Sequence, residues 1–186
     1  MARRPLAVAI TGGIAAGKSE ALAAFARHGA ATLSADAIVH DLLANDPEVR
    51  AAIAERWGDD AVGDRARIGE IVFRDRAGLE WLEQLLHPKT RAAADAWLAS
   101  VDAPLAAVEI PLLYETGGEG RFDAVVVVTA PPEVRAARRA GVADRESRLI
   151  PDDEKALRAD YAFVNDGPLE DLDEFVAKVV GALCGP

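Results

Sequence analysis

One stretch decides the fold of this chain: Ala7-Val-Ala-Ile-Thr-Gly-Gly-Ile-Ala-Ala-Gly-Lys-Ser-Glu20. Within it, Gly12 to Ser19 satisfy the pattern G-x-x-x-x-G-K-[ST], a glycine-rich turn whose backbone N–H groups surround a polyphosphate. A short apolar strand, Leu6–Ile10, leads into the turn, and the helix that begins near Gly17 adds the positive end of its dipole. The stretch therefore predicts a binding site for a nucleoside triphosphate.

Two side chains of this loop have chemistry of their own. Lys18 supplies a positive charge for the β- and γ-phosphates, and the hydroxyl of Ser19 can ligate Mg²⁺. The alternative interpretation is an ordinary strand, turn and helix with a solvated lysine. We favour the phosphate-binding interpretation because the apolar strand and the helical pattern flank the loop as the motif requires.

The composition is that of one globular domain. The chain has 186 residues, of which 51% are hydrophobic and 28% are charged. No apolar run is long enough to cross a bilayer, and a single cysteine, Cys184, excludes an internal disulfide, so we expect a cytoplasmic protein with no membrane partner. The formal net charge of −10 argues against nucleic acid as a partner. Polyanionic substrates would then need positive charge concentrated at their site.

Apolar runs alternate with helical patterns along the chain, which predicts an α/β fold with a parallel sheet buried on both faces. We expect five strands, at Leu6–Ile10, Ala31–Leu33, Leu105–Ile110, Ala124–Thr129 and Tyr161–Val164. Ligands of such sheets bind beyond the carboxyl ends of the strands. The candidate functional residues are therefore those that come directly after a strand.

Residues 59–102 or so contain helical stripes and no strand pattern. Pro88 is expected to stop one of these helices and to begin the next. We interpret the segment as a helical insertion that holds the substrate, within a single domain of residues 1–186 whose core comprises 1–58 and 103–186.

Two acidic residues occupy strand ends. Asp36 lies just beyond the second strand and should face the same crevice as the phosphate-binding loop; it could also serve as a helix N-cap, and the two roles can coexist. Glu109 ends the third strand, where nucleoside triphosphatases often place an acid that helps to hold Mg²⁺. The alternative for Glu109 is a solvated charge.

Basic residues gather in two places. His87 and Arg91 are four residues apart and share one helix face; such a pair is more often a surface feature than a ligand site. Within fourteen residues the chain also places five arginines: Arg135, Arg138, Arg139, Arg145 and Arg148. They could form a solvated helix face. We favour a lid whose guanidinium groups stabilise charge on a transferring phosphoryl group, without choosing among the arginines.

Together these motifs resemble the dephospho-coenzyme A kinase family, P-loop kinases with a three-layer α/β fold, over nearly the whole chain. The most particular match is His87-Pro88 after a leucine stripe, joined to Pro111-Leu-Leu-Tyr-Glu115. Further matches are Ser34-Ala-Asp-Ala-Ile38, Pro151-Asp-Asp-Glu-Lys155 and Asn165-Asp-Gly167.

The resemblance implies that ATP phosphorylates the ribose 3′-hydroxyl of dephospho-coenzyme A, with Lys18, Asp36 and Arg148 as catalytic residues and Asp36 as base or orienter. It implies a short lid at about 135–157 that contains Arg138 or Arg139 and Arg148. ATP would bind to Gly12, Gly13, Ile14, Ala15, Ala16, Gly17, Lys18, Ser19, Glu20 and, near the adenine, Asn165. Mg²⁺ would bind to Ser19 and Glu109. The dephospho-coenzyme A pocket would be shaped by Asp36, His87, Arg91, Leu112, Leu113 and Glu115.

This chain departs from the family pattern at several positions. Ser34 replaces the first acid of the usual Asp-Ala-Asp, and Ala15-Ala16 stand where Gly-Ser is usual. Glu20 replaces Thr, Glu109 replaces Asp, and Leu149 occupies a glutamine position in a shortened lid. Two other functions remain open: a P-loop kinase for another small acceptor, such as a nucleoside monophosphate, and a non-catalytic nucleotide-binding switch.

Overall fold

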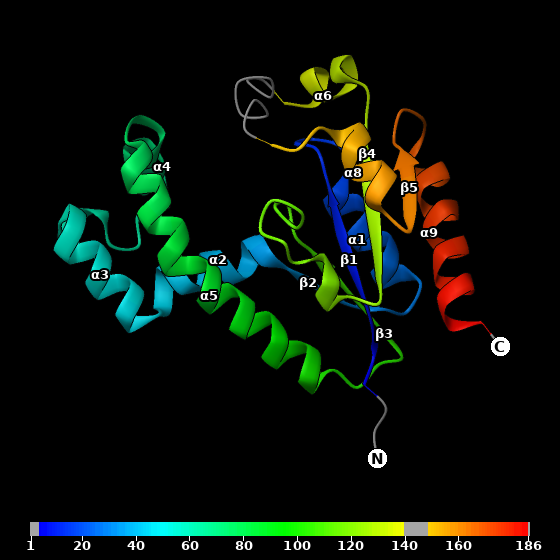
Figure 1. The fold of residues 1–186 in the computed structure, drawn as a ribbon, viewed down its shortest axis with the longest axis horizontal. Coiled ribbons are helices and arrows are strands. Elements are labelled where there is room, and N and C mark those ends of the chain that lie inside the picture. Colours follow the sequence, from blue (N-terminus) through cyan, green and yellow to red (C-terminus); the bar gives the residue numbers. More distant parts are fainter. Residues whose placement is uncertain (1–3, 140–148, 186) are drawn as a thin grey trace. The chain divides into compact units, whose positions relative to one another are not determined.

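The computed structural model describes residues 4–139 and 149–185 and contains a five-stranded parallel sheet (Figure 1). The strands follow the order β2-β3-β1-β4-β5. Their bounds are β1 Leu6–Gly12, β2 Ala31–Ser34, β3 Leu105–Glu109, β4 Ala124–Thr129 and β5 Tyr161–Val164. All five predicted strands are confirmed. β1 runs two residues beyond the predicted end because Thr11 and Gly12 still pair with Val127 and Val128 of β4.

Both faces of the sheet are covered. On one face, Val8 and Ile10 pack with α1 (Lys18–Arg27) and α9 (Leu169–Cys184). On the other, Ala9 and Val127 belong to a cluster that includes residues of α8 (Asp152–Arg158). Successive side chains of a strand point to opposite faces, so a strand buried on both sides has an uninterrupted apolar sequence. A further helix, α6 (Pro132–Arg138), follows β4.

The chain divides into two compact units, which are described separately. The sheet unit comprises residues 1–34 and 98–186, and the helical unit comprises Ala35–Trp97. The helical unit contains α2 (Ala35–Asn45), α3 (Pro47–Trp57), α4 (Arg65–Arg74) and most of α5 (Arg76–Ser100). It starts well before the expected insertion at about 59 because α2 and α3 share one apolar cluster with α4 and α5: Leu43, Val49, Ile53, Ala61, Ile68, Leu82 and Leu86.

The predicted break at Pro88 is wrong. α5 is continuous from Arg76 to Ser100 and contains Pro88 in its interior. A proline there removes one backbone hydrogen bond and crowds the preceding turn, at a cost of about 3 kcal/mol. Burial on both sides of Pro88 offsets this cost, since Leu86 and Ala94 are both less than one-tenth exposed.

No helix within residues 4–139 and 149–185 combines the length and the apolar character needed to cross a membrane.

Candidate active site

The phosphate-binding loop connects β1 to α1, and its glycines have conformations that other residues cannot adopt. Gly12 has φ +135°, and a Cβ atom there would overlap the carbonyl oxygen of Val128. Gly17 has φ +109°, and a Cβ atom there would overlap the side-chain amide of Asn165. Ala15, with φ +58°, is left-handed without being glycine, which costs about 1 kcal/mol. The G-x-x-x-x-G spacing is thus a requirement of the backbone and of its neighbours.

The two reactive side chains of the loop have close partners within the sheet unit. Lys18 Nζ donates a hydrogen bond to the carbonyl oxygen of Gly13 at 2.7 Å. Ser19 Oγ, in the first turn of α1, lies 3.2 Å from Oε1 of Glu109, the last residue of β3. Glu109 is buried. The hydroxyl and carboxylate that the sequence nominated for Mg²⁺ are therefore in contact, and both are oxygen ligands of the kind that Mg²⁺ prefers.

Arg138 and Asn165 hold the other end of the loop. Arg138 donates from Nη1 to the carbonyl oxygens of Ala15 and Ala16, at 3.3 and 3.2 Å, and from Nη2 to the carbonyl oxygen of Asn165 at 3.2 Å. Asn165 Nδ2 donates to the same Ala16 oxygen at 2.8 Å. Because a trans peptide points its C=O and the following N–H in opposite directions, the N–H of Gly17 points away from Arg138. Both side chains thus help to set the shape of the loop.

A second arginine of α6 reaches the beginning of the loop. Arg135 is buried, and its Nη1 lies 3.6 Å from Oδ2 of Asp152, the first residue of α8. A Cβ atom on Gly13 would lie 2.8 Å from the same Nη1 and would overlap the Asp152 carboxylate. Arg135 and Asp152 therefore meet directly beside Gly13. The sequence showed that arginines gather here, but not which of them reach the loop.

The turn that follows β3 is tied to α8 by a buried ion pair. Glu115 Oε1 lies 2.8 Å from Nζ of Lys155, whose side chain is fully buried, and it accepts the backbone N–H of Ile150 at 3.1 Å. Leu113 is fully buried in the apolar cluster beneath the sheet. The neighbouring Tyr114 packs under the guanidinium of Arg158, and burial raises the pKa of its hydroxyl. Glu115 and Leu113 thus have extensive structural contacts, which sequence reasoning missed.

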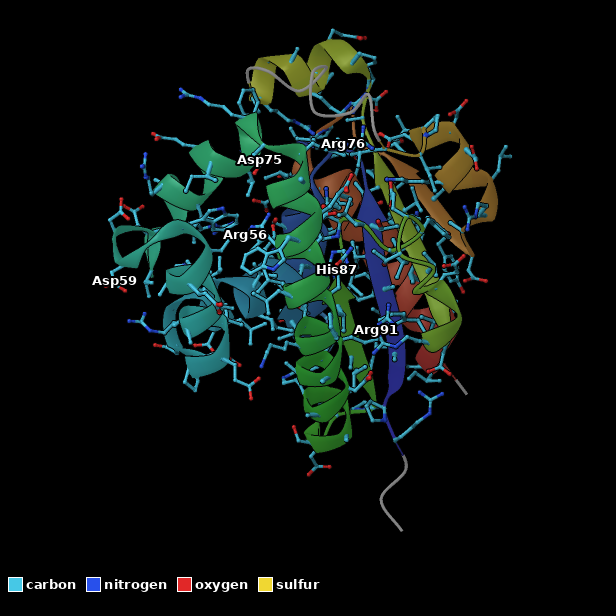
Figure 2. All side chains as sticks on the ribbon, turned by 60° about the vertical axis from the view of Figure 1, so that its left-hand side comes forward. Arg56, Asp59, Asp75, Arg76, His87 and Arg91 are labelled. Carbon is cyan, nitrogen blue, oxygen red and sulfur yellow. The ribbon has the colours of Figure 1, made fainter. Side chains whose placement is uncertain are left out.

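Leu112, partly buried in the same turn, is the last candidate of the sheet unit, and the other acceptor-side candidates belong to the helical unit. Asp36 is exposed in the first turn of α2, which starts at Ala35, so it lies inside the helix instead of at the capping position. It follows Ser34, the last residue of β2, which pairs with Glu109 of β3. His87 and Arg91 project from one side of α5 (Figure 2). Arg145 and Arg148 of the expected lid lie outside the described residues.

The chain is similar over most of its length to known proteins of one family. The family model for dephospho-CoA kinase matches residues 6–171. Dephospho-CoA kinases from Rhodopseudomonas palustris (strain BisB18) and Mesorhizobium japonicum are 37% and 38% identical to this chain. The first alignment covers 93% of each protein, and the second covers 97% of this chain and 98% of the relative.

Solved structures give the same result. The crystal structure of a Thermus thermophilus protein is 34% identical, with a TM-score of 0.82 over 98% of this chain and all of its own. A Campylobacter jejuni dephospho-CoA kinase, 26% identical, has a TM-score of 0.71 over 97% of this chain and 98% of its own. A Bacteroides thetaiotaomicron shikimate kinase, at 19% identity and a TM-score of 0.50 over 97% of this chain and 99% of its own, shares the fold. The chain belongs to the dephospho-CoA kinase family.

Proposed function

We propose that this protein transfers the γ-phosphate of ATP to the ribose 3′-hydroxyl of dephospho-CoA, which yields coenzyme A. The observation that carries the proposal is the loop of Gly12 to Ser19 at the carboxyl end of β1, with Glu109 at the end of the adjacent strand β3. Membership of the family, shown by a match over residues 6–171, supports the choice of acceptor.

The loop binds the triphosphate, and Lys18 moves from the Gly13 carbonyl to the β- and γ-phosphates when they arrive. Mg²⁺ would be held by Ser19 and Glu109, and it would neutralise phosphate charge that builds up during transfer. Within the described residues, no group of three or more His, Cys, Asp or Glu side chains could hold a metal ion. A donor set of one hydroxyl and one carboxylate fits Mg²⁺, which usually keeps water and phosphate oxygens in its shell.

Asp36 acts on the acceptor. In the transfer, the bond from the 3′-oxygen to the γ-phosphorus forms while the bond from that phosphorus to the bridging oxygen of ATP breaks. ADP leaves with the electron pair, and the hydroxyl proton passes to the Asp36 carboxylate. His87 and Arg91 bind the acceptor, since their cationic or hydrogen-bonding groups suit its phosphates. Positioning and charge neutralisation carry most of the rate in such reactions.

The test is an assay for the 3′-phosphorylated product with ATP, Mg²⁺ and dephospho-CoA, with a nucleoside monophosphate as the competing acceptor. Of these two acceptors, we expect the protein to phosphorylate only dephospho-CoA. Asp36→Asn should lower kcat by about 10²-fold, a general-base magnitude, and should leave ATP affinity unchanged. Asp41→Asn, an exposed acid on the same helix, is the matched control. Normal turnover by Asp36→Asn would remove Asp36 from the reaction, and ATP binding without transfer would point to a nucleotide switch.

A further inference from the structure

The arginines of α6 divide between the two ends of the phosphate-binding loop. Arg138 serves the end at Gly17, where it binds the carbonyl oxygens of Ala15, Ala16 and Asn165. Arg135 serves the beginning, beside Gly13. The two arginines are at positions i and i+3 of one short helix and share a face of it. Their guanidinium groups nevertheless reach different parts of the same loop.

Lys18 shows which end of the loop receives the terminal phosphates. In this motif the lysine ammonium binds the β- and γ-phosphates. Here Lys18 Nζ contacts the carbonyl oxygen of Gly13, and Arg135 Nη1 lies beside the same residue. Two cations from different elements, α1 and α6, therefore converge on one peptide of the loop. Asp152 brings one negative charge to the same place, so the balance of these three side chains is one positive charge. In a chain with a net charge of −10, a local excess of positive charge suits a phosphate.

Asp152 explains why a buried arginine is held at this position. Removal of a guanidinium from water is costly unless an anion lies close to it, and the Asp152 carboxylate supplies that charge from the first turn of α8. The Nη1–Oδ2 distance of 3.6 Å is an ion-pair distance and exceeds that of a hydrogen bond. The charge of the Asp152 carboxylate therefore orients Arg135, although Nη1 and Oδ2 are too far apart for a hydrogen bond with each other.

We propose that Arg135 is a catalytic residue that contacts the terminal phosphate of ATP during transfer, and that Asp152 is its positioning residue. The proposal rests on the proposed function. Phosphoryl transfer places charge on the equatorial oxygens of the moving group, and the planar fork of a guanidinium matches two of those oxygens at once. Arg135 would strengthen its contact as this charge develops, so its contribution would fall on kcat and not on nucleotide affinity.

The experiment compares Arg135→Ala, Arg135→Gln and Arg135→Lys with the wild-type full-length protein. For each we would measure kcat with dephospho-CoA, the thermal midpoint, and the affinities for ADP and for ADP with aluminium fluoride, which mimics the phosphoryl group in transit. We expect Ala and Gln to lower kcat by about 10³-fold, the effect of an arginine on phosphoryl transfer. ADP affinity should stay within about threefold, while the aluminium fluoride complex weakens. Lys should give an intermediate kcat, because its ammonium keeps the charge and loses the fork.

Asp152→Asn should lower kcat by about 10²-fold, the effect of a misplaced catalytic group, and should leave ADP affinity unchanged. Asp153→Asn, the exposed neighbour on α8, should leave both kcat and ADP affinity unchanged. Lys178→Ala, an exposed lysine of α9, controls for the loss of one positive charge. A kcat within threefold of wild type in Arg135→Gln would overturn the proposal, and so would a parallel loss of ADP affinity, thermal midpoint and kcat, which indicates a structural role. Either result leaves the proposed function standing if the wild-type protein makes coenzyme A. An inactive wild type would overturn the proposed function itself.

Discussion

The sheet unit and the helical unit offer functional groups in different ways. In the sheet unit, the candidate site is built from backbone and from side chains that are already bound: Ser19 to Glu109, and Asn165 to the loop. In the helical unit, Asp36 and Arg91 are exposed on helices. The helical unit also contains an aromatic pair, Trp57 and Trp81, which packs against its apolar cluster, with the guanidinium of Arg56 4.8 Å from the centre of the Trp81 ring.

This difference suits two separate tasks, the binding of the phosphates of ATP by the sheet unit and the binding of the acceptor by the helical unit. A phosphate chain is the same in every ATP-dependent kinase, so a backbone cradle fixed by a buried sheet can serve all of them. An acceptor differs from one kinase to the next, and exposed side chains on a separate helical unit can change without disturbing the sheet. We therefore expect substitutions to be more damaging in the sheet unit, and the following predictions test that contrast.

The largest effect is expected at Gly12. Gly12→Ala places a Cβ atom against the carbonyl oxygen of Val128, in a conformation that alanine rarely adopts. Overpacking and backbone strain together should lower the free energy of unfolding by about 5 kcal/mol, measured by urea denaturation. Gly181→Ala, on α9 with open space around it, is the control and should stabilise the protein by about 1 kcal/mol. Equal stability of the two variants would contradict the conclusion that the backbone and its neighbours require glycine at position 12.

The buried pair of Lys155 and Glu115 should come next. Lys155→Met leaves the Glu115 carboxylate buried without its cation, and we expect a loss of about 4 kcal/mol in the free energy of unfolding. The double variant Lys155→Met with Glu115→Leu should recover most of that loss, because no buried charge remains. Lys89→Met in the helical unit is the matched control, since Lys89 pairs with Asp46 and the exposed Glu48 near solvent, and its effect should be much smaller.

A core substitution in the helical unit tests whether the two units unfold together. Ile53 is fully buried on α3, and Ile53→Ala should cost about 3 kcal/mol. All three tryptophans, Trp57, Trp81 and Trp97, lie in the helical unit, so their fluorescence reports on that unit. In urea, the fluorescence transition of the variant should precede the loss of a bound fluorescent ATP analogue. Coincident curves would show one cooperative unit.

The smallest effect concerns one acid in each unit. In the helical unit, the backbone N–H of Val49, and then Lys89, lower the pKa of Asp46 below 3.8. In the sheet unit, hydrogen bonds from Arg27 and then His28 lower the pKa of Asp173 in the same way. A carboxylate whose pKa is lowered by folding contributes its full stabilisation when the pH is above its ordinary pKa. That stabilisation is lost as the pH falls through the pKa of the folded state. The thermal midpoints of Asp46→Asn and Asp173→Asn should therefore lie below that of the wild type at neutral pH and approach it as the pH falls below 3.8. If the difference in thermal midpoint between variant and wild type stayed constant with pH, these carboxylates would be excluded as its source.

Much of the candidate site could be predicted because its signals are local. Gly12 and Gly17 reveal the loop because their φ angles, +135° and +109°, are ones that residues with a side chain rarely adopt. Glu109 could be nominated because it ends a strand, and parallel strands bring their carboxyl ends to one edge. The helix break predicted at Pro88 is wrong for the opposite reason. The local rule against proline within a helix was overcome by burial of Leu86 and Ala94, which no local pattern reveals.

The sequence by itself determined the phosphate-binding loop, the five strands, the family and the choice of Asp36 as a candidate. Each of these could be recognised from the spacing of residues along the chain. Only the tertiary structure decided that Arg135 and Arg138 reach opposite ends of the loop, that Glu115 pairs with Lys155, and that α2 and α3 belong to the helical unit. The physical reason is that ion pairs and apolar clusters join residues far apart in the chain, and their partners are selected by packing in three dimensions.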